Sequence, residues 1–251
     1  MSVIMTKYFI GTSGWNYDHW KGSFYPGDVP KTRWLEFYAG RFRTVEVNYS
    51  FYRWPSEKCM KGWKQRAPAG FEFTMKAPRT ITHVKRLKDV GRLVSDFYRL
   101  TGMLGAKAGC HLFQLPPSMV RDDKGIARLG TFLKLLDERK RNVIEFRHGS
   151  WWDGDVYGML KDAGAGFVTV AGLGMPGEAV VTGATAYFRF HGTERYGGDY
   201  PEAMLRQYSE AMEKARCGRV YAYFNNDMGG FAPKNAMEIG SMLATGGSAK
   251  R

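Results

Sequence analysis

Residues 110–147 read CHLFQLPPSMVRDDKGIARLGTFLKLLDERKRNVIEFR, and this stretch decides the fold class. Its two ends, Cys110–Leu115 and Asn142–Arg147, are short apolar runs that predict β-strands. Between them, apolar residues recur every three or four positions, which predicts an amphipathic helix over Asp122–Arg139. A strand, a helix and a second strand in this order favour parallel pairing of the strands through a right-handed crossover.

The same alternation of strand and helix extends over nearly the whole chain. Six further segments have the strand pattern, namely Tyr8–Thr12, Thr44–Asn48, Phe71–Lys76, Phe167–Ala171, Ala186–His191 and Arg219–Asn225. Helical patterns lie between most of the strands, at Pro30–Phe42, Ser56–Arg66, Val84–Leu104, Trp152–Ala163, Glu202–Ala215 and Lys234–Ala244. One connection differs, because Gly172–Gly183 is rich in glycine and has no helical period.

Eight strand–helix units in 251 residues predict an α/β fold, a (β/α)8 TIM-barrel-like single domain whose sixth helix is short or missing. The domain is expected over residues 1–245, followed by a flexible C-terminal tail at 246–251. A doubly wound open sheet is the alternative. Against it, the first strand leads into Gly11-Thr12-Ser13-Gly14-Trp15 rather than into a GxGxxG turn and a helix.

Charge gives the first indication of a partner. The chain has 37 Lys and Arg against 24 Asp and Glu, a formal net charge of +13, which attracts anions such as phosphates and nucleic acid. It also has 16 Phe, 14 Tyr and 7 Trp, and basic residues with stacking aromatics are typical of single-stranded nucleic-acid binding. The alternative interpretation is that the aromatic residues form the core and the charge serves solubility.

The sequence predicts neither a membrane protein nor a secreted one. No run approaches the ~18 consecutive apolar residues of a membrane helix, and the first seven residues lack the apolar stretch of a secretory signal. Cys59, Cys110 and Cys217 lie far apart without metal-site spacing and are expected to be reduced thiols. We therefore expect a cytoplasmic protein with no membrane association.

Polar residues concentrate at the carboxyl ends of the predicted strands, which form the site-bearing face of this kind of barrel. Because side chains alternate in direction along a strand, two polar residues separated by one position share a face. The candidate catalytic residues are Glu46, Glu145 and His191. The candidate ligand-binding residues are Trp15, Asn48, Lys76, Gln114, Arg147, His148, Arg189, Asn225 and Asp227.

These residue types favour an anionic ligand at the mouth of the barrel, either a phosphorylated small molecule or a nucleotide or nucleic acid. Lys76, Arg147 and Arg189 would clamp the anion, since arginine suits bidentate contacts to phosphate. Amide side chains would orient polar groups, and the two glutamates with His191 would serve as acids and bases if the protein is an enzyme. The alternative is that the charges form an internal layer of salt bridges. No protein partner is predicted.

Taken together, the motifs resemble those of the YecE-like proteins, the domain of unknown function 72 (DUF72) family. The residues that carry the resemblance are Ile10–Trp15, Trp20–Gly22, Phe24–Pro26, Glu46–Asn48, Phe51–Tyr52, Phe73–Arg79, Ile81–His83, Phe113–Ser118, Glu145–His148, Ser150–Trp151, Tyr187–Gly192 and Tyr223–Asp227. The resemblance covers nearly the whole chain. It implies a TIM-barrel-like fold but no established activity.

The implied fold is similar to the sugar isomerase and endonuclease IV group of barrels, which hold metals with clusters of His, Asp and Glu. This sequence departs from that pattern, since only His148 and His191 stand on strand ends, among cations that would repel a metal. No metal or cofactor is therefore predicted. Three alternatives stay open: a metal-dependent hydrolase or isomerase acting on sugars or phosphodiesters, a metal-free glycosidase using Glu46 and Glu145, and a non-catalytic nucleic-acid adaptor.

Overall fold

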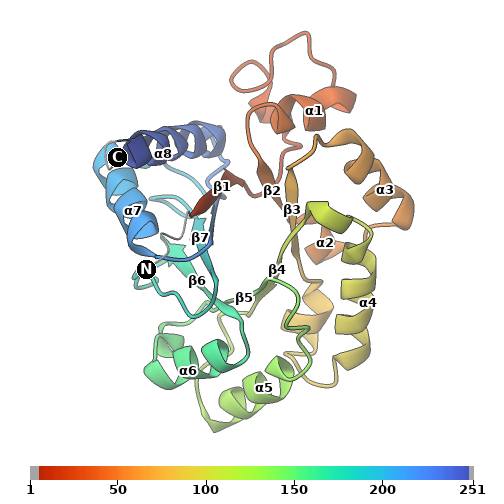
Figure 1. The fold of residues 1–251 in the computed structure, drawn as a ribbon, viewed down its shortest axis with the longest axis vertical. Helices are drawn as coiled ribbons and strands as arrows, with labels where there is room; N and C mark the ends of the chain where they lie inside the picture. Colours follow the sequence, from red (N-terminus) through yellow and green to blue (C-terminus); the bar gives the residue numbers. More distant parts are fainter. Residues whose placement is uncertain (1–5, 249–251) are drawn as a thin grey trace.

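Eight parallel strands follow one another around the centre of the molecule, and helices surround them (Figure 1). The computed structural model describes residues 6–248. The strands are β1 Lys7–Thr12, β2 Thr44–Val47, β3 Glu72–Lys76, β4 Ala108–Gln114, β5 Asn142–Glu145, β6 Gly166–Ala171, β7 Thr185–Phe190 and β8 Arg219–Phe224. Each lies where the sequence predicted a strand, and together they form a nearly closed (β/α)8 TIM-barrel-like fold, as predicted.

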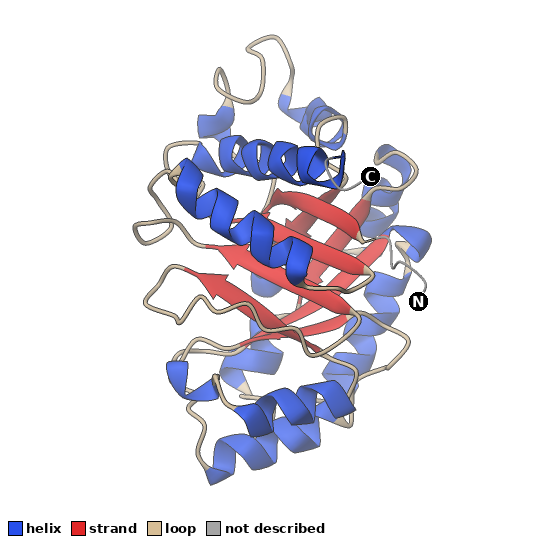
Figure 2. Ribbon diagram, turned by 60° about the vertical axis from the view of Figure 1, so that its left-hand side comes forward, coloured by secondary structure: helices blue, strands red, loops and turns tan. Residues whose placement is uncertain are grey.

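Helices cover the outside of the strands (Figure 2). The α-helices are α1 Trp34–Ala39, α2 Tyr49–Tyr52, α3 Glu57–Arg66, α4 Gly91–Gly102, α5 Asp123–Leu133, α6 Gly154–Asp162, α7 Glu202–Lys214 and α8 Phe231–Ser248. Short 3-10 turns at Asp18–Trp20, Lys31–Arg33, Gly105–Lys107 and Gly149–Trp151 and a π-helical turn at Thr80–Val84 complete the set. Residues 172–184 connect β6 to β7 without a helix, so the sixth crossover helix is missing.

No helix in the described part of the chain is long and apolar enough to cross a membrane.

Several predicted helices are shorter than their sequence patterns, among them Pro30–Phe42, of which only Trp34–Ala39 is α-helical. The pattern over Val84–Leu104 gives a helix only from Gly91, because Arg86, Leu87 and Asp89 adopt positive φ angles of 48°, 66° and 52°. Leu87 is nevertheless buried, so its apolar spacing reflects packing of a loop rather than a helical turn. The helix predicted over Asp122–Arg139 ends at Leu133 and continues as turns. Of the tail expected at 246–251, α8 includes the first three residues, and 249–251 lie outside the described residues.

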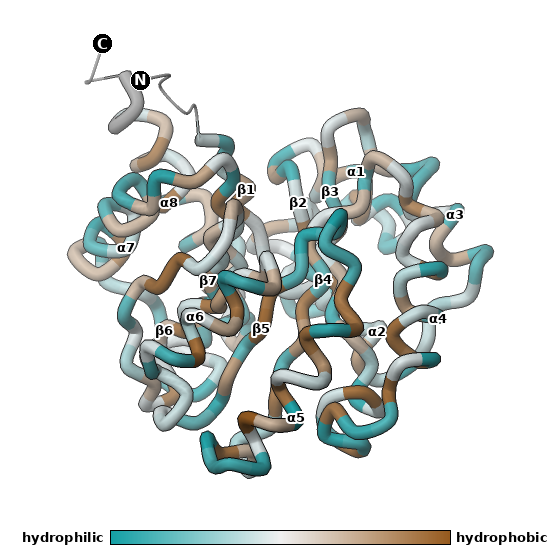
Figure 3. The backbone as a smooth tube through the Cα atoms, turned by 60° about the horizontal axis from the view of Figure 1, so that its bottom comes forward, coloured by the Kyte–Doolittle hydropathy of each residue, from teal (hydrophilic) through white to brown (hydrophobic). Residues whose placement is uncertain are grey.

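Apolar residues pack on both sides of the strands. The outward-facing side chains pack against the helices, whereas a smaller cluster fills the barrel interior. The interior cluster consists of Phe9, Cys110, Leu112, Val143, Val168, Val170, Tyr187, Tyr221 and Tyr223. Figure 3 shows the hydrophobic stretch along β5 and the hydrophilic turns at the outer rim. These side chains fill the interior between the strands, below their carboxyl ends.

The barrel closes unevenly. β1 pairs with β8 over six residue pairs, from Lys7–Arg219 to Thr12–Phe224. Between β1 and β2 the main-chain contact is a single bridge at Ser13 and Glu46, supported by a 2.8 Å hydrogen bond from the Gly14 N–H to the Glu46 carbonyl. The seam between β1 and β2 is therefore the weak edge of the barrel.

A buried tyrosine on α1 completes that seam. The Tyr38 hydroxyl accepts a hydrogen bond from the Thr12 N–H at 2.9 Å and lies 3.1 Å from the Thr44 carbonyl oxygen, to which it donates. Gly11 faces the same carbonyl so closely that a Cβ there would lie 2.3 Å from the Thr44 oxygen. Any side chain at position 11 would thus push the two strands apart.

Candidate functional site

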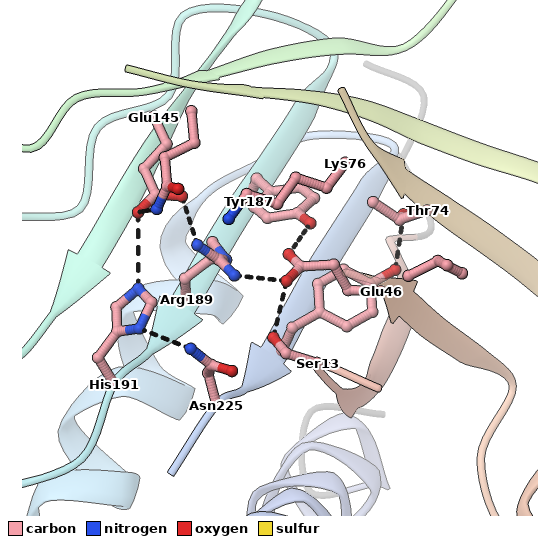
Figure 4. Close-up of polar contacts among 12 residues, drawn as sticks. Ser13, Glu46, Thr74, Lys76, Glu145, Tyr187, Arg189, His191 and Asn225 are labelled. Atoms are coloured by element: carbon pink, nitrogen blue, oxygen red, sulfur yellow. Dashed lines mark hydrogen bonds and ion pairs between the residues drawn. The ribbon is translucent and has the colours of Figure 1, made fainter. Parts of the chain in front are cut away.

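A buried arginine on β7 joins two glutamates from opposite sides of the barrel (Figure 4). Arg189 Nη2 donates to Glu46 Oε1 and Nη1 donates to Glu145 Oε2, each at 2.5 Å. Arg189 is 1% exposed and both carboxylates are fully buried. Because an ion pair at this depth cannot be replaced by water, the three side chains hold the ends of β2, β5 and β7 at fixed positions.

Neutral groups complete the shell of Glu46. The Ser13 hydroxyl donates to Oε1 at 2.7 Å, and the Tyr187 hydroxyl donates to Oε2 at 2.6 Å. Burial, followed by the nearby Glu46 carboxylate, raises the pKa of Tyr187 well above its ordinary value, so this hydroxyl stays protonated and donates. Tyr187, Arg189 and His191 share one face of β7 because side chains alternate along a strand.

Glu145 has a richer set of partners. It accepts from Gln114 Nε2 at 3.0 Å, from the Arg147 Nε–H and from Arg189. Burial alone would raise the pKa of Glu145, but the Arg147 and Arg189 guanidinium groups, with His191, hold it well below its usual value. Glu145 is therefore ionised at neutral pH, which makes it a poor proton donor.

His191 lies beside this carboxylate as a neutral imidazole. Burial lowers its pKa to about 3 against the opposing effect of Glu145, whose Oε1 lies 3.6 Å from His191 Nε2. Arg147 Nη2 is 3.3 Å from the same nitrogen, and Asn225 Nδ2 is 3.2 Å from Nδ1. His191 is thus fixed on both sides and is fully buried.

Above this layer, the barrel mouth contains a cavity of about 550 Å³. Its lining residues come from the ends or following loops of most strands, namely Tyr17, Asn48, Phe51, Tyr52, Lys76, Arg79, His83, Gln114, Arg147, Arg189, Tyr196, Asn225 and Asp227. The Asn48 side-chain oxygen is buried there without a hydrogen-bond partner among the described residues. A cavity of this volume suits a small organic ligand, with the charged layer as its floor.

Lys76 is a cation of the mouth that makes no ion pair within residues 6–248. It ends β3, is 7% exposed, and its Nζ lies 4.0 Å from the centre of the Phe51 ring. Within residues 6–248 its amine makes no hydrogen bond or ion pair, and Figure 4 accordingly shows no contact to it. Burial, and then the charge of Arg189, lower its pKa to about 7 despite the nearby glutamates. The amine is therefore close to half neutral at physiological pH.

Two further titratable groups line the rim. His83, on the π-helical turn, packs edge-on against Phe51 with ring centroids 4.9 Å apart, and its Nδ1 contacts the Thr82 hydroxyl at 2.9 Å. Burial and then the charge of Lys76 lower the pKa of His83 to about 4, so its ring is neutral at pH 7. In the same lining, burial raises the pKa of Asp227, whose carboxylate lies 3.8 Å from His19.

Most of the predicted site residues meet at this mouth. The cavity is lined by Asn48, Lys76, Gln114, Arg147, Arg189, Asn225 and Asp227, and the layer beneath it contains Glu46, Glu145 and His191. Trp15 lies elsewhere, because it packs against Trp63 on α3 at 5.5 Å. His148 is exposed and contacts the Ser150 hydroxyl, where it caps the turn at Gly149–Trp151.

The sequence-based set left out part of the site. Tyr17, Tyr196, Arg79 and His83 also line the cavity. Arg79 and His83 lie just after the third predicted strand, a position that suggests that they face the mouth, whereas strand periodicity cannot place the side chains of Tyr17 and Tyr196. A signal for Tyr187 was present, since it stands two residues before Arg189 on the same strand face. Ser13 had no such signal, because its partner Glu46 comes from a different strand.

The side chains considered as metal ligands do not lie close together. Within the described residues, no three His, Cys, Asp or Glu side chains form a cluster that could hold a metal ion. Glu46 and Glu145 direct their oxygens at Arg189, and His148 points to its own turn. The donor geometry therefore does not favour the metal-dependent alternative.

A larger groove of about 700 Å³ lies away from the strand ends that carry these charges. It runs between the start of β1, the turn before β2 and helix α8. Its charged lining residues are Lys7, Arg41 and Arg43, without any acid, His or Cys among them. This groove lacks the convergent polar groups of the mouth, so the mouth is the better candidate for a functional site.

The fold and the mouth together define a (β/α)8 barrel protein with a charged cavity at the carboxyl ends of its strands. The family described as "Protein of unknown function DUF72" matches residues 9–250, and the chain belongs to this family. Among curated proteins, UPF0759 protein YunF of Bacillus subtilis is 25% identical, with 94% of both chains covered. UPF0759 protein YecE of Escherichia coli K12 is 30% identical over 114 residues, covering 45% of this chain and 41% of YecE.

Solved structures agree with this assignment. A DUF72 family protein from Thermotoga maritima is 31% identical, with a TM-score of 0.86 over 94% of this chain and 99% of the other. A DUF72 family protein from Enterococcus faecalis is 20% identical, with a TM-score of 0.83 over 95% and 96% of the two chains. Outside the family, a D-psicose 3-epimerase from Clostridium cellulolyticum is 11% identical, with a TM-score of 0.54 over 94% of this chain and 98% of the other. This similarity concerns the fold alone.

Proposed function

We propose that the protein binds a small anion, bearing a phosphate or carboxylate group, in the cavity at the mouth of its barrel. The observation that carries this proposal is an imbalance of charge in the lining. Lys76, Arg79, Arg147 and Arg189 line the cavity, and Asp227 is its single acidic lining residue. Glu46 and Glu145 beneath the cavity pair with Arg147 and Arg189, so Lys76 and Arg79 are the cations in excess. A ligand with a negative charge would balance them.

The four cations have different tasks. Arg189 and Arg147 are already bonded to Glu145, so they shape the floor of the cavity as positioning residues. Lys76 and Arg79 make no ion pair within the described chain. These two are the cations that an anion would contact, and the guanidinium of Arg79 suits the bidentate geometry of phosphate or carboxylate.

Asn48 supports a ligand with polar groups besides its anionic end. Its side-chain oxygen is buried and has no donor from the described residues. Since a buried acceptor without a donor is costly, a ligand hydroxyl or amine at this point would lower the free energy of the bound state. The amide groups of Gln114 and Asn225 line the same cavity.

The test compares two variants that lose the same charge. Arg79→Gln removes a cation from the mouth, and Lys134→Gln removes an exposed one at the C-terminal end of α5, which lies at the other end of the barrel. Thermal unfolding is followed in inorganic phosphate and in a nucleoside monophosphate. A ligand at a hundred times its Kd stabilises the fold by about 2.7 kcal/mol.

We expect the wild type and Lys134→Gln to gain the same thermal shift, and Arg79→Gln to need about tenfold more ligand, a loss of about 1.4 kcal/mol of binding free energy. No shift in the wild type, or an equal loss in both variants, would overturn the proposal. In the second case the effect would belong to the net charge of +13 and not to the cavity.

A nucleotide at the end of a nucleic acid is the second candidate, and the rim favours it. Tyr52 is 76% exposed and lines the cavity, and Tyr49 and Trp54 beside it are 49% and 37% exposed. Exposed rings beside a cationic site stack on bases. A thermal shift produced by a single-stranded oligonucleotide but not by inorganic phosphate, lost in Tyr52→Ala, would select this candidate. Equal binding by Tyr52→Ala would exclude it.

A further inference from the structure

The proposed function accounts for the charge of Lys76 but not for the way in which the fold holds its amine. A lysine that only binds an anion works best fully protonated and accessible to solvent. Lys76 is instead 7% exposed, with its Nζ over the face of the Phe51 ring. Burial disfavours the ammonium form, although the face of the ring attracts it, and the amine lies in a cavity large enough for a small molecule.

The layer beneath the cavity keeps its carboxylates away from this amine. Glu46 and Glu145 are the acids nearest in the fold, and Arg189 bonds both of them at 2.5 Å. Neither comes within 4.0 Å of Lys76 Nζ. A lysine placed next to cations, with the available acids already paired, is the arrangement that activates an amine as a nucleophile.

We propose that Lys76 is a nucleophile that forms an imine with its ligand, so that the anion bound at the mouth is a small aldehyde or ketone bearing a phosphate or carboxylate. This inference rests on the proposed function, because the anionic group is what holds the carbonyl carbon near the amine. Arg79 would bind the anionic group and Lys76 would attack the carbonyl.

The covalent step balances without any further reagent. The nitrogen lone pair of the neutral amine adds to the carbonyl carbon, a C–N bond forms, and the carbonyl π electrons move to oxygen, which takes one proton from nitrogen. The C–O bond then breaks as the C=N bond forms, and the oxygen leaves as water with the second amine proton. Nothing is oxidised or reduced. His83, a neutral imidazole in the same lining, would pass protons between the two atoms.

The charged and titratable groups that surround this amine come from four segments of the chain. They are Glu46 on β2, Arg79 and His83 after β3, Glu145 and Arg147 at and after β5, and Arg189 on β7. The balance of these groups leaves Lys76 with a pKa of about 7. At pH 7 a larger fraction of Lys76 is therefore neutral than of an ordinary lysine, whose pKa is near 10.4.

The experiment traps the imine in the wild-type protein. Glycolaldehyde phosphate is added at pH 7, sodium cyanoborohydride reduces the imine to a secondary amine, and peptide mass spectrometry measures the modified fraction of each lysine. The exposed Lys134 is the internal control. Uncharged glycolaldehyde, used in parallel, reports the reactivity of the amine without the anionic group.

We expect Lys76 to be modified at least tenfold faster than Lys134, with a rate that rises through about pH 7 for Lys76 and at much higher pH for Lys134. The phosphate-bearing probe should exceed glycolaldehyde at Lys76 in the wild type, and Arg79→Gln should remove that preference while glycolaldehyde still reacts. Lys76→Gln should lose the adduct and retain the native far-UV spectrum.

The two proposals fail differently. If Lys76 reacts no faster than Lys134 while inorganic phosphate still stabilises the wild type through Arg79, the imine is excluded and anion binding stands. Lys76 could instead react fast but equally with both probes, while phosphate gives no thermal shift. In that case the amine is activated, but the proposal of an anionic ligand is wrong. The inference that the substrate is an anionic aldehyde or ketone is then overturned as well.

Discussion

Arg189 shows how much of the site one residue can determine. It stands between two carboxylates that come from strands on different sides of the barrel, and each of its terminal nitrogens bonds one of them. Without it, two negative charges would face one another in a dry interior, which costs several kcal/mol per ion. The sequence predicted that these residues share the strand ends. It did not predict which arginine would be paired, because that depends on how three strands meet.

The first prediction concerns this arginine and its partly exposed neighbour. Arg189→Met should lower the free energy of unfolding by about 3–5 kcal/mol, since it leaves buried carboxylates without a cation. Arg147→Met should cost less, because Arg147 is 11% exposed and Glu145 would keep Arg189. Urea denaturation of both variants at pH 7 measures the difference.

Neutralising the acids supplies the control for that comparison. The combined variant Glu46→Gln, Glu145→Gln and Arg189→Met should recover part of the lost stability, because neither buried carboxylate is charged any longer. Arg147 then lacks Glu145, but its side chain is 11% exposed. If Arg189→Met unfolds at the same urea concentration as Arg147→Met, the charged layer is not what holds the strand ends together.

At the scale of elements, strands were easier to predict than helices. Each strand is a short apolar run bounded by polar residues, and burial on both faces makes such runs unambiguous. Helix limits depend on local backbone choices. Ser56 and Asp122 do cap α3 and α5 through their side-chain oxygens, as the start of a helix requires. Leu87 has the apolar spacing of α4 but adopts a left-handed conformation, which spacing alone cannot reveal.

The second prediction concerns the seam between β1 and β2. Gly11→Ala would place a Cβ 2.3 Å from the Thr44 oxygen and 2.9 Å from the Tyr38 hydroxyl. The strands must then separate, so we expect a loss of at least about 2 kcal/mol in the free energy of unfolding. Faster amide exchange at Thr12, whose N–H bonds Tyr38, would locate the damage.

Gly62 on α3 offers a matched control for that substitution. A Cβ at this position meets nothing within 4 Å, so Gly62→Ala adds the same methyl group without a clash. Helix propensity predicts a gain of up to about 1 kcal/mol. If the two variants have the same free energy of unfolding, β1 and β2 can accommodate a side chain at position 11 without loss of stability, and the prediction is wrong.

For the whole molecule, burial of two histidines governs behaviour in acid. His111 on β4 and His191 beyond β7 both have a pKa lowered to about 3, chiefly by burial. Below pH 6.5 the unfolded chain binds protons at these positions and the native protein does not, so stability falls as pH falls from about 6.5 to 3. The third prediction is a loss of about 2 kcal/mol for each histidine between pH 7 and pH 5.

His111→Gln tests this directly, because glutamine keeps an amide that can reach the Thr101 hydroxyl, 2.8 Å from His111 Nε2. Urea midpoints at pH 7 and pH 5 should show a smaller difference in this variant than in the wild type. His148→Gln, at an exposed position, should leave the difference unchanged. An unchanged difference in His111→Gln would show that this imidazole accepts a proton in the native state.

Across the whole molecule, some site residues could be placed from the sequence and others could not. Ten of the twelve candidate residues, chosen because they lie at strand ends with a spacing of two, line the mouth or lie in the layer beneath it. Their side chains could be placed because backbone geometry fixes the direction of a strand and the alternation of its side chains. Trp15 and His148 follow strands by position, but their side chains turn to neighbouring loops and helices. Loop residues such as Tyr196 needed the coordinates, since no period relates them to the barrel axis.

The uneven closure of the barrel has a consequence for biosynthesis. β1 leaves the ribosome first, yet its six-residue ladder is with β8, which begins only at Arg219. At about 5–20 residues per second, the first strand waits roughly 10–40 s for its principal partner. Throughout that time the nascent barrel is an open sheet with an unpaired edge. A circularly permuted gene that encodes β1 directly after β8 would let both strands pair as they emerge, and would move the point of last closure to the β1–β2 seam.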